Sequence, residues 1–218
     1  MTPLRRRTAG FTLIEVLVAL GAMALLALMS WRGLDGMAQS QAVNRGRGDA
    51  LLTLQTTLTQ WTADLDAVTQ LGATTPIDWD GRVLRLTRRG TDDATPVALV
   101  VAWTLRVDAD GPHWLRWQSP PFTTRGGWRQ AWNLAASWAQ EGTGEARRNE
   151  VVLMPLTGWQ LSYFRNGAWA PAISADALGP LAPLPEGVRV VLDLPPGPSL
   201  AGLVTRDWVR PTLNTPKS

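Results

Sequence analysis

One acidic residue interrupts an apolar segment near the start of the chain. Glu15 is the single charged residue between Phe11 and Trp31. An isolated carboxylate in a membrane-spanning helix costs about 2.5–3.5 kcal/mol on insertion scales, and such groups are usually paired. The chemistry that Glu15 suggests is therefore the pairing of two charges inside a membrane, not catalysis.

Catalytic chemistry has little support elsewhere in the chain. The single histidine, His113, follows Gly111-Pro112, and the sequence promises neither an orienting acid nor a nucleophile beside it. We expect an exposed turn histidine, with a catalytic base as the alternative. Cysteine is absent, which excludes thiolate catalysis, cysteine-ligated zinc and disulfides. With no phosphate-binding loop and no serine elbow, we expect neither an enzyme nor a cofactor.

Several aspartates lie close together in sequence without forming a complete metal motif. Asp78-Trp79-Asp80-Gly81 echoes part of a calcium loop, as do Asp108 and Asp110, but neither continues into the spaced acids and closing glutamate of an EF-hand. We interpret both as turns and expect no metal, with a cation site as the alternative. Asp64 and Asp66, two residues apart on an expected helix, point to different faces.

The segment that carries Glu15 fits a membrane helix. At about 1.5 Å per residue, residues 11–31 span about 31 Å, which matches a hydrocarbon core of about 30 Å. Arg5, Arg6 and Arg7 precede the segment, and no acid accompanies them in residues 1–10. This places the basic end in the cytoplasm and the remainder outside.

Three interpretations of this segment compete. A secretory signal needs small residues at its end, and Ala27-Leu28-Met29-Ser30-Trp31 is a poor version of that site. A simple signal anchor fits the hydropathy but leaves Glu15 without a partner. The third interpretation rests on Gly10-Phe11-Thr12-Leu13-Ile14-Glu15, which resembles the type IV prepilin cleavage motif in full.

The prepilin resemblance implies a role for each residue of the motif. Residues 1–10 are then a leader, removed by a membrane peptidase that cuts between Gly10 and Phe11. Phe11 becomes the N-methylated first residue, and Glu15 neutralises the Phe11 amine of a neighbouring subunit. This pairing is physically reasonable, because two opposite charges in lipid are tolerable together and costly apart.

The charge of the chain gives no support to nucleic-acid binding. The net charge is +3 at pH 7. Removal of Arg5, Arg6 and Arg7 with the leader subtracts three and leaves the side chains near neutrality. The basic character therefore belongs to the leader, and no basic face is required to explain it.

The helix is expected to continue beyond the membrane through residues 32–72. An amphipathic stripe, with spacings of three and four, is formed by Leu51, Leu54, Leu58, Trp61, Leu65 and Val68. We expect this stripe to pack against the following domain; a coiled coil is the alternative. Glycines between anchor and stripe (Gly33, Gly36, Gly46 and Gly48) suggest bending or local melting. Gly72 and Pro76 are expected to close the helix.

Residues 73–218 are expected to form an α+β head on an antiparallel sheet. Alternating or β-branched runs predict strands with one buried face at residues 82–87, 97–107, 114–118, 159–163 and 188–194. Asp110-Gly111 and Asn166-Gly167 predict hairpin turns. Residues 128–139 suit a short helix but remain ambiguous beside Gly126-Gly127. Residues 178–185 and 195–198 are expected to be proline-rich loops, and residues 210–218 a frayed tail.

The twelve tryptophans are an unusual feature of the composition. Burial in the core and in half-buried strand faces is the expected explanation. A partner-binding surface is the alternative, for which Trp128, Trp132 and Trp138 are the candidates, since tryptophan is enriched at binding hot spots.

A wider resemblance extends beyond the leader. The sequences at residues 31–36, 54–66, 158–164 and 184–190, with Trp169, are similar to the general secretion pathway protein J family, the minor pseudopilins J of type II secretion. This implies a pilin-like fold: a helix, transmembrane at residues 11–31 and amphipathic at 32–72, packed on the periplasmic head of residues 73–218.

The resemblance also implies a function and partners. A minor pseudopilin J joins pseudopilins I and K at the tip of a pseudopilus and primes assembly of the major pseudopilin, so that folded proteins are exported. A prepilin peptidase and an inner-membrane assembly platform are further partners. The protein would be single-pass in the bacterial inner membrane, with its head in the periplasm. The alternatives are a W-like minor pilin of a type IV pilus and a signal-anchored periplasmic enzyme or sensor.

Overall fold

The computed structural model describes residues 11–72, 74–90, 97–141, 144–178, 183–197 and 199–211. The chain divides into two compact units, Met1–Arg47 and Gly48–Ser218. Gly10 and the arginines of the expected leader therefore lie outside the described residues, as does most of the expected C-terminal tail.

Helix α1 spans Leu13–Asp66, and its residues 13–47 form the described helix of the first unit. Every described residue of that unit is exposed. The local melting predicted at the glycines between anchor and stripe is wrong, because the helix runs through all four of them. Glycine lowers helix stability by about 1 kcal/mol relative to alanine, yet it keeps its N–H and so does not interrupt the hydrogen-bond ladder.

The end of α1 differs from the predicted end at Gly72. The helix ends at Asp66 because the residues that follow pair with strand β2 (Val83–Arg89) instead. Ala67 O accepts a hydrogen bond from Arg89 N at 2.9 Å, and Thr69 N donates to Thr87 O at 2.9 Å. Gly72 takes a positive φ of 50° in the turn that follows.

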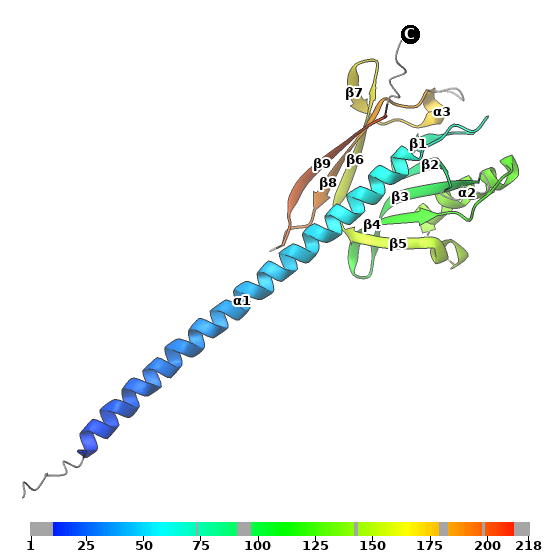
Figure 1. Ribbon diagram of the computed structural model, residues 1–218. Helices are drawn as coiled ribbons and strands as arrows, with labels where there is room; N and C mark the ends of the chain where they lie inside the picture. Colours follow the sequence, from blue (N-terminus) through cyan, green and yellow to red (C-terminus); the bar gives the residue numbers. More distant parts are fainter. Residues whose placement is uncertain are drawn as a thin grey trace, which may run out of the picture. The chain divides into compact units, whose positions relative to one another are not determined.

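The second unit contains a five-stranded antiparallel sheet (Figure 1). Its order is β1-β2-β3-β4-β5, with bounds Ile77–Trp79, Val83–Arg89, Ala98–Asp108, Gly111–Gln118 and Glu150–Pro155. The predicted hairpin is confirmed: Asp108 pairs with Gly111, whose φ is 109°. Strands β1 and β5 were not predicted.

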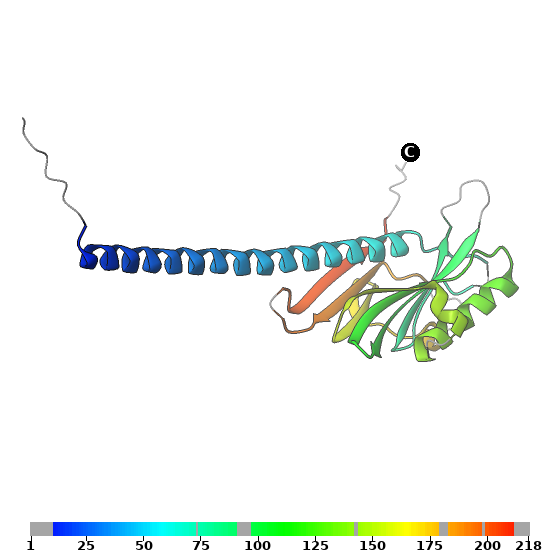
Figure 2. The same ribbon diagram turned by 90° about the horizontal axis from the view of Figure 1, so that it is seen from below.

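Both faces of this sheet are covered, so the expectation of one buried face is wrong for it. Leu84, Val101 and Trp103 pack in the core that contains Trp61 and Leu65 of α1. The alternate residues of the same strands pack against helix α2 (Arg125–Glu141) in a second core. Figure 2 shows α2 on one face of the sheet. A strand buried on both faces is apolar throughout, which explains the continuous run in β3.

Helix α2 settles the ambiguous segment at residues 128–139. Gly127 N donates to the Thr124 hydroxyl at 3.1 Å, which caps the start of the helix. The buried face of α2 consists of Trp128, Ala131, Trp132, Ala135, Trp138 and Ala139. The suggestion that these tryptophans form a partner surface is therefore wrong: Trp138 is fully buried, and Trp128 and Trp132 are 9% exposed.

A second antiparallel sheet follows, in the order β7-β6-β8-β9. Its strands are β6 (Gly158–Arg165), β7 (Ala168–Pro171), β8 (Gly187–Leu194) and β9 (Gly202–Val209). The predicted Asn166-Gly167 turn is confirmed by φ values of 52° and 79°. A 3₁₀ helix, η1 (Gly144–Asn149), and the short helix α3 (Ala175–Leu178) lie between strands.

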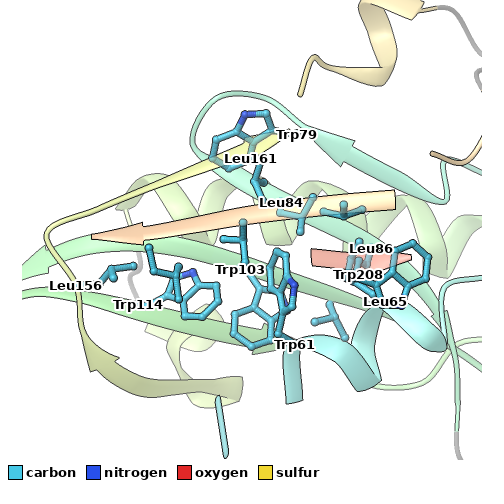
Figure 3. Packing of buried hydrophobic residues seen from close by; sticks show 14 of the residues in the cluster. Trp61, Leu65, Trp79, Leu84, Leu86, Trp103, Trp114, Leu156, Leu161 and Trp208 are labelled. Carbon is cyan, nitrogen blue, oxygen red and sulfur yellow. The ribbon is translucent and has the colours of Figure 1, made fainter. Parts of the chain in front are cut away.

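Trp61 of α1 is fully buried in the main core and lies beside Trp103 (Figure 3). Its ring centroid is 5.2 Å from that of Trp103 and 5.4 Å from that of Trp114. Leu161 of β6 and Trp208 of β9 belong to the same core, so both sheets pack with the end of the helix. The fold class is thus the expected one: a long, initially apolar helix followed by antiparallel sheets in an α+β arrangement.

Candidate functional site

The start of α1 is a capping box built by Thr12 and Glu15. Thr12 is the cap residue before Leu13, and Glu15 is the third residue of the helix. Glu15 Oε2 accepts hydrogen bonds from Thr12 N at 2.9 Å and from the Thr12 hydroxyl at 2.8 Å. Glu15 N points back to the Thr12 hydroxyl, with 3.4 Å between the two atoms. This reciprocal arrangement satisfies donors that a helix start otherwise leaves free.

The capping box was missed at the level of sequence, although its signature was visible. A Thr and a Glu three residues later, with apolar residues following, is the pattern that marks a helix start. The same carboxylate now has a local function, capping, and an expected one between subunits.

Both hydrogen bonds from Thr12 use the same carboxylate oxygen. Within the described part of the chain, Glu15 Oε1 has no hydrogen-bond partner. Phe11, the expected first residue after cleavage, is 88% exposed. The helix start therefore has a free acceptor at Glu15 and an accessible residue at Phe11, while Gly10 lies outside the described residues.

The helix that carries this site is the one membrane-span candidate among the described residues, by length and composition. Its large side chains are exposed in the first unit, including Leu17, Leu25 and Leu28 at 59%, 61% and 58%. Such a surface needs an apolar environment, either lipid or other helices. Trp31 is 73% exposed at the end of the apolar segment, where tryptophan commonly meets the membrane–water interface.

The other residues considered for chemistry have structural positions. His113 is half-buried in β4, not in an exposed turn, and its Nδ1 lies 3.1 Å from Gly111 O. Asp80 Oδ1 accepts from the backbone N–H groups of Arg82 and Val83, each at 2.9 Å, and so shapes the β1–β2 turn. Among the described residues, no three histidine or acidic side chains gather into a metal site.

Asp78 is buried and joins strand β1 to the loop before α3. Its Oδ2 pairs with Arg85. Its Oδ1 accepts from the Ser174 hydroxyl at 2.9 Å and from Ala175 N at 2.7 Å. Burial of the phenol raises the pKa of Tyr163, and the nearby carboxylate of Asp78 raises it further.

The polar contacts of Asp64 were also not foreseen. Asp64 is fully buried and forms an ion pair with Arg88 of β2. Arg116 of β4 donates to it through Nε at 2.7 Å and Nη2 at 2.9 Å. The indole N–H of Trp103 in β3 donates at 3.0 Å, and so does the amide of Gln60.

Asp66 fulfils the expectation that the two helix aspartates face different ways. Its Oδ1 accepts a 2.7 Å hydrogen bond from the indole N–H of Trp208, in β9 of the second sheet. Asp64 thus contacts the first sheet and Asp66 the second. Asp64 is fully buried, whereas Asp66 is exposed and contacts the second sheet through its hydrogen bond with Trp208.

Comparisons with known proteins agree with the start of the chain and with its fold. Residues 5–31 match the prokaryotic N-terminal methylation motif. Over 205 residues the chain is 27% identical to type II secretion system protein J of Vibrio cholerae serotype O1, an alignment that covers 87% of this chain and 83% of that protein. Together with the apolar helix and the antiparallel sheets, these findings make the chain similar to type II secretion system protein J along most of its length, with a prokaryotic N-terminal methylation motif at its start.

Proposed function

We propose that this chain is a minor pseudopilin of a type II secretion system and acts in the complex at the pseudopilus tip. The observation that carries the proposal is the similarity to protein J along most of the chain, combined with the methylation motif at the start of α1. In this role the protein primes assembly of the major pseudopilin together with minor pseudopilins I and K. The filament then exports folded proteins across the outer membrane.

The N-terminal residues have defined roles in this proposal. Water cleaves the Gly10–Phe11 peptide bond at a prepilin peptidase, which leaves a carboxylate on Gly10 and an amine on Phe11. An activated methyl donor then methylates that amine. The new positive charge near the start of α1 is opposed by the helix dipole, and a carboxylate offsets this.

Glu15 serves two groups at once in the assembled filament. Oε2 retains the Thr12 hydrogen bonds, while Oε1 accepts from the Phe11 amine of a neighbouring subunit. Without that amine, the carboxylate in lipid costs about 2.5–3.5 kcal/mol. The membrane therefore favours assembled over isolated subunits at this position.

The proposed location follows from the anchor. Residues 11–31 span the inner membrane once, with residues 1–10 cytoplasmic before processing and the head in the periplasm. The inner-membrane assembly platform is the partner that extracts the subunit. The proposed role is structural and not enzymatic, and it is supported by the ion pairs that the buried carboxylates of Asp64 and Asp78 form with Arg88 and Arg85.

The proposal is tested by deleting the gene and scoring one strain for exoprotein secretion and for twitching motility. Loss of secretion with motility intact is expected. Loss of motility with secretion intact would instead establish the W-like minor pilin. Mass spectrometry of the mature protein is expected to begin at N-methylated Phe11; an intact Met1 or Thr2 terminus would favour the signal-anchored enzyme or sensor.

The role of Glu15 is separated from helix capping by two variants. Glu15→Gln keeps the shape and an acceptor but removes the charge, whereas Thr12→Val removes the capping hydroxyl and keeps the charge. Filament assembly is expected to fail in Glu15→Gln and to persist in Thr12→Val. Equal loss in both would assign Glu15 to capping and not to amine pairing.

A further inference from the structure

A cavity of about 480 Å³ lies in the second unit where four segments meet: the turn after α1, the end of β2, the start of β3 and the start of α2. Leu71 comes from the turn after α1, Val97 and Ala98 from the start of β3, and Phe122 and Trp128 from the segment that begins α2. This volume lies within the usual range for ligand-binding sites, about 300–1,000 Å³. No residue of the capping box lines the cavity. A role for the cavity is therefore independent of the proposed function.

Hydrogen bonds hold the walls of this cavity in place. Ala98 and Phe122 exchange backbone hydrogen bonds of 3.1 and 2.9 Å. The indole N–H of Trp128 donates to the Thr87 hydroxyl at 2.9 Å, which fixes its ring as part of the wall. A methyl group added at Gly127 would lie 2.9 Å from Phe122 Cβ, so the start of α2 packs closely on the Phe122 side chain. The cavity is therefore preformed.

Two arginines, Arg89 at the end of β2 and Arg125 at the start of α2, line the cavity beside its apolar wall. Both are exposed, and neither side chain has a hydrogen bond or ion pair with another described residue. The described lining contains no acidic side chain. By contrast, the neighbouring Arg88 turns to Asp64, and Arg85 turns to Asp78.

An apolar cavity bordered by two unpaired guanidinium groups selects for a particular chemistry. A large apolar side chain removes Leu71, which is 42% exposed, and Phe122 from water. A carboxylate beside it accepts charge-assisted hydrogen bonds from the guanidinium groups. We infer that this cavity binds a segment of a partner protein in which acidic side chains flank a large apolar one.

The test uses the full chain in detergent micelles, with Leu71→p-benzoylphenylalanine as a photoreactive group at the cavity. Three biotinylated peptides at about 1 mM, a concentration suited to weak binding, serve as probes: Gly-Glu-Phe-Glu-Gly, its Gln-Phe-Gln counterpart and its Glu-Ala-Glu counterpart. The first is expected to cross-link about tenfold more than either of the others.

Charge variants locate the binding. Arg89→Gln combined with Arg125→Gln is expected to lower the yield of the acidic peptide to that of its amide counterpart. Arg129→Gln, an exposed arginine of α2 outside the cavity lining, is the matched control and is expected to leave the yield unchanged. Tryptophan fluorescence on unfolding in urea verifies that each variant is folded.

Several results would overturn the inference. Equal yields for the three peptides, or no cross-linking by any of them, would show that the cavity does not recognise this chemistry. Equal losses in Arg129→Gln and the double variant would show general attraction to a basic surface.

Discussion

Replacement of Asp64 by alanine tests how the end of α1 is held on the first sheet. The Asp64 carboxylate is fully buried and receives hydrogen bonds from two arginines, an indole and an amide. The side chains of Arg88 and Arg116 are only 10% and 11% exposed. Asp64→Ala therefore leaves two nearly buried positive charges facing each other without a counter-charge.

The expected loss in the free energy of unfolding is about 3–5 kcal/mol, the usual cost of breaking a buried ion pair from one side. Asp64→Asn retains an acceptor for the indole of Trp103 and is expected to lose about 1–3 kcal/mol. Replacement of all three ionic residues (Asp64→Leu, Arg88→Met and Arg116→Leu) is expected to recover most of the loss, because it removes the desolvation cost with the pair.

The assay is urea unfolding of the full chain in detergent, followed by tryptophan fluorescence. Trp103 contacts both Asp64 and Trp61, so its environment changes when this contact opens. Asp49→Ala, an exposed acid on the same helix, is the control and is expected to change stability by less than about 0.5 kcal/mol. If Asp64→Ala matched Asp49→Ala, the buried network would contribute nothing to docking, and the reasoning would be refuted.

Three further predictions concern the head. Tyr163 is the single tyrosine, and burial raises the pKa of its phenol. The unfolded chain therefore loses the phenol proton at a lower pH than the folded chain does, and the free energy of unfolding is expected to fall above about pH 10. Tyrosinate absorbance is expected to appear together with unfolding. Tyrosinate formation in the folded protein near pH 10 would contradict this. The hydrogen bond from Arg189 lowers the pKa of Asp207 in the folded protein. The contribution of this pair to stability is therefore present above the pKa that Asp207 has in the unfolded chain, and it is lost as the pH falls through the lower pKa of the folded protein. Asp207→Asn should therefore flatten the fall of the unfolding midpoint below about pH 4, and an unchanged fall would exclude the pair as its cause. Trp138→Ala removes a fully buried indole and its 2.7 Å hydrogen bond to Glu150, and a loss of about 3–5 kcal/mol in stability is expected. A partner-binding defect with unchanged urea unfolding would instead restore the interface interpretation.

Patterns local in sequence predicted much of the fold. The period of two in β6 and β8 and the period of three to four in residues 51–65 each depend on which side chains one element buries, and neighbouring residues reveal this. The Asn166-Gly167 turn was predictable because both residues tolerate the positive φ that the hairpin requires. Strands β1, β5 and β9 were missed: β1 is three residues long, and β5 and β9 are mostly exposed, so their side chains show no clean alternation.

The errors arose where distant parts of the chain decide local structure. The end of α1 is set by β2, whose backbone satisfies Ala67 and Thr69, and not by Gly72 or Pro76. The tryptophans of α2 were ambiguous because an apolar helix face looks the same whether it meets a sheet or a partner. The cavity at Arg89 and Arg125 is lined by residues from separate elements, so no single sequence motif predicts it.

The two aspartates near the end of α1 combine local and distant information. Their spacing alone placed them on different faces of the helix, but only the fold shows that Asp64 meets the first sheet and Asp66 the second. Burial of the apolar stripe around Trp61 and Leu65 stabilises the docking of the helix. Because apolar contacts are not directional, they would allow the helix to slide along the sheets. Hydrogen bonds to two carboxylates on opposite sides of the stripe tolerate neither sliding nor rotation of the helix. We therefore attribute the register between α1 and both sheets to Asp64 and Asp66, and the strength of the docking to the tryptophan core between them.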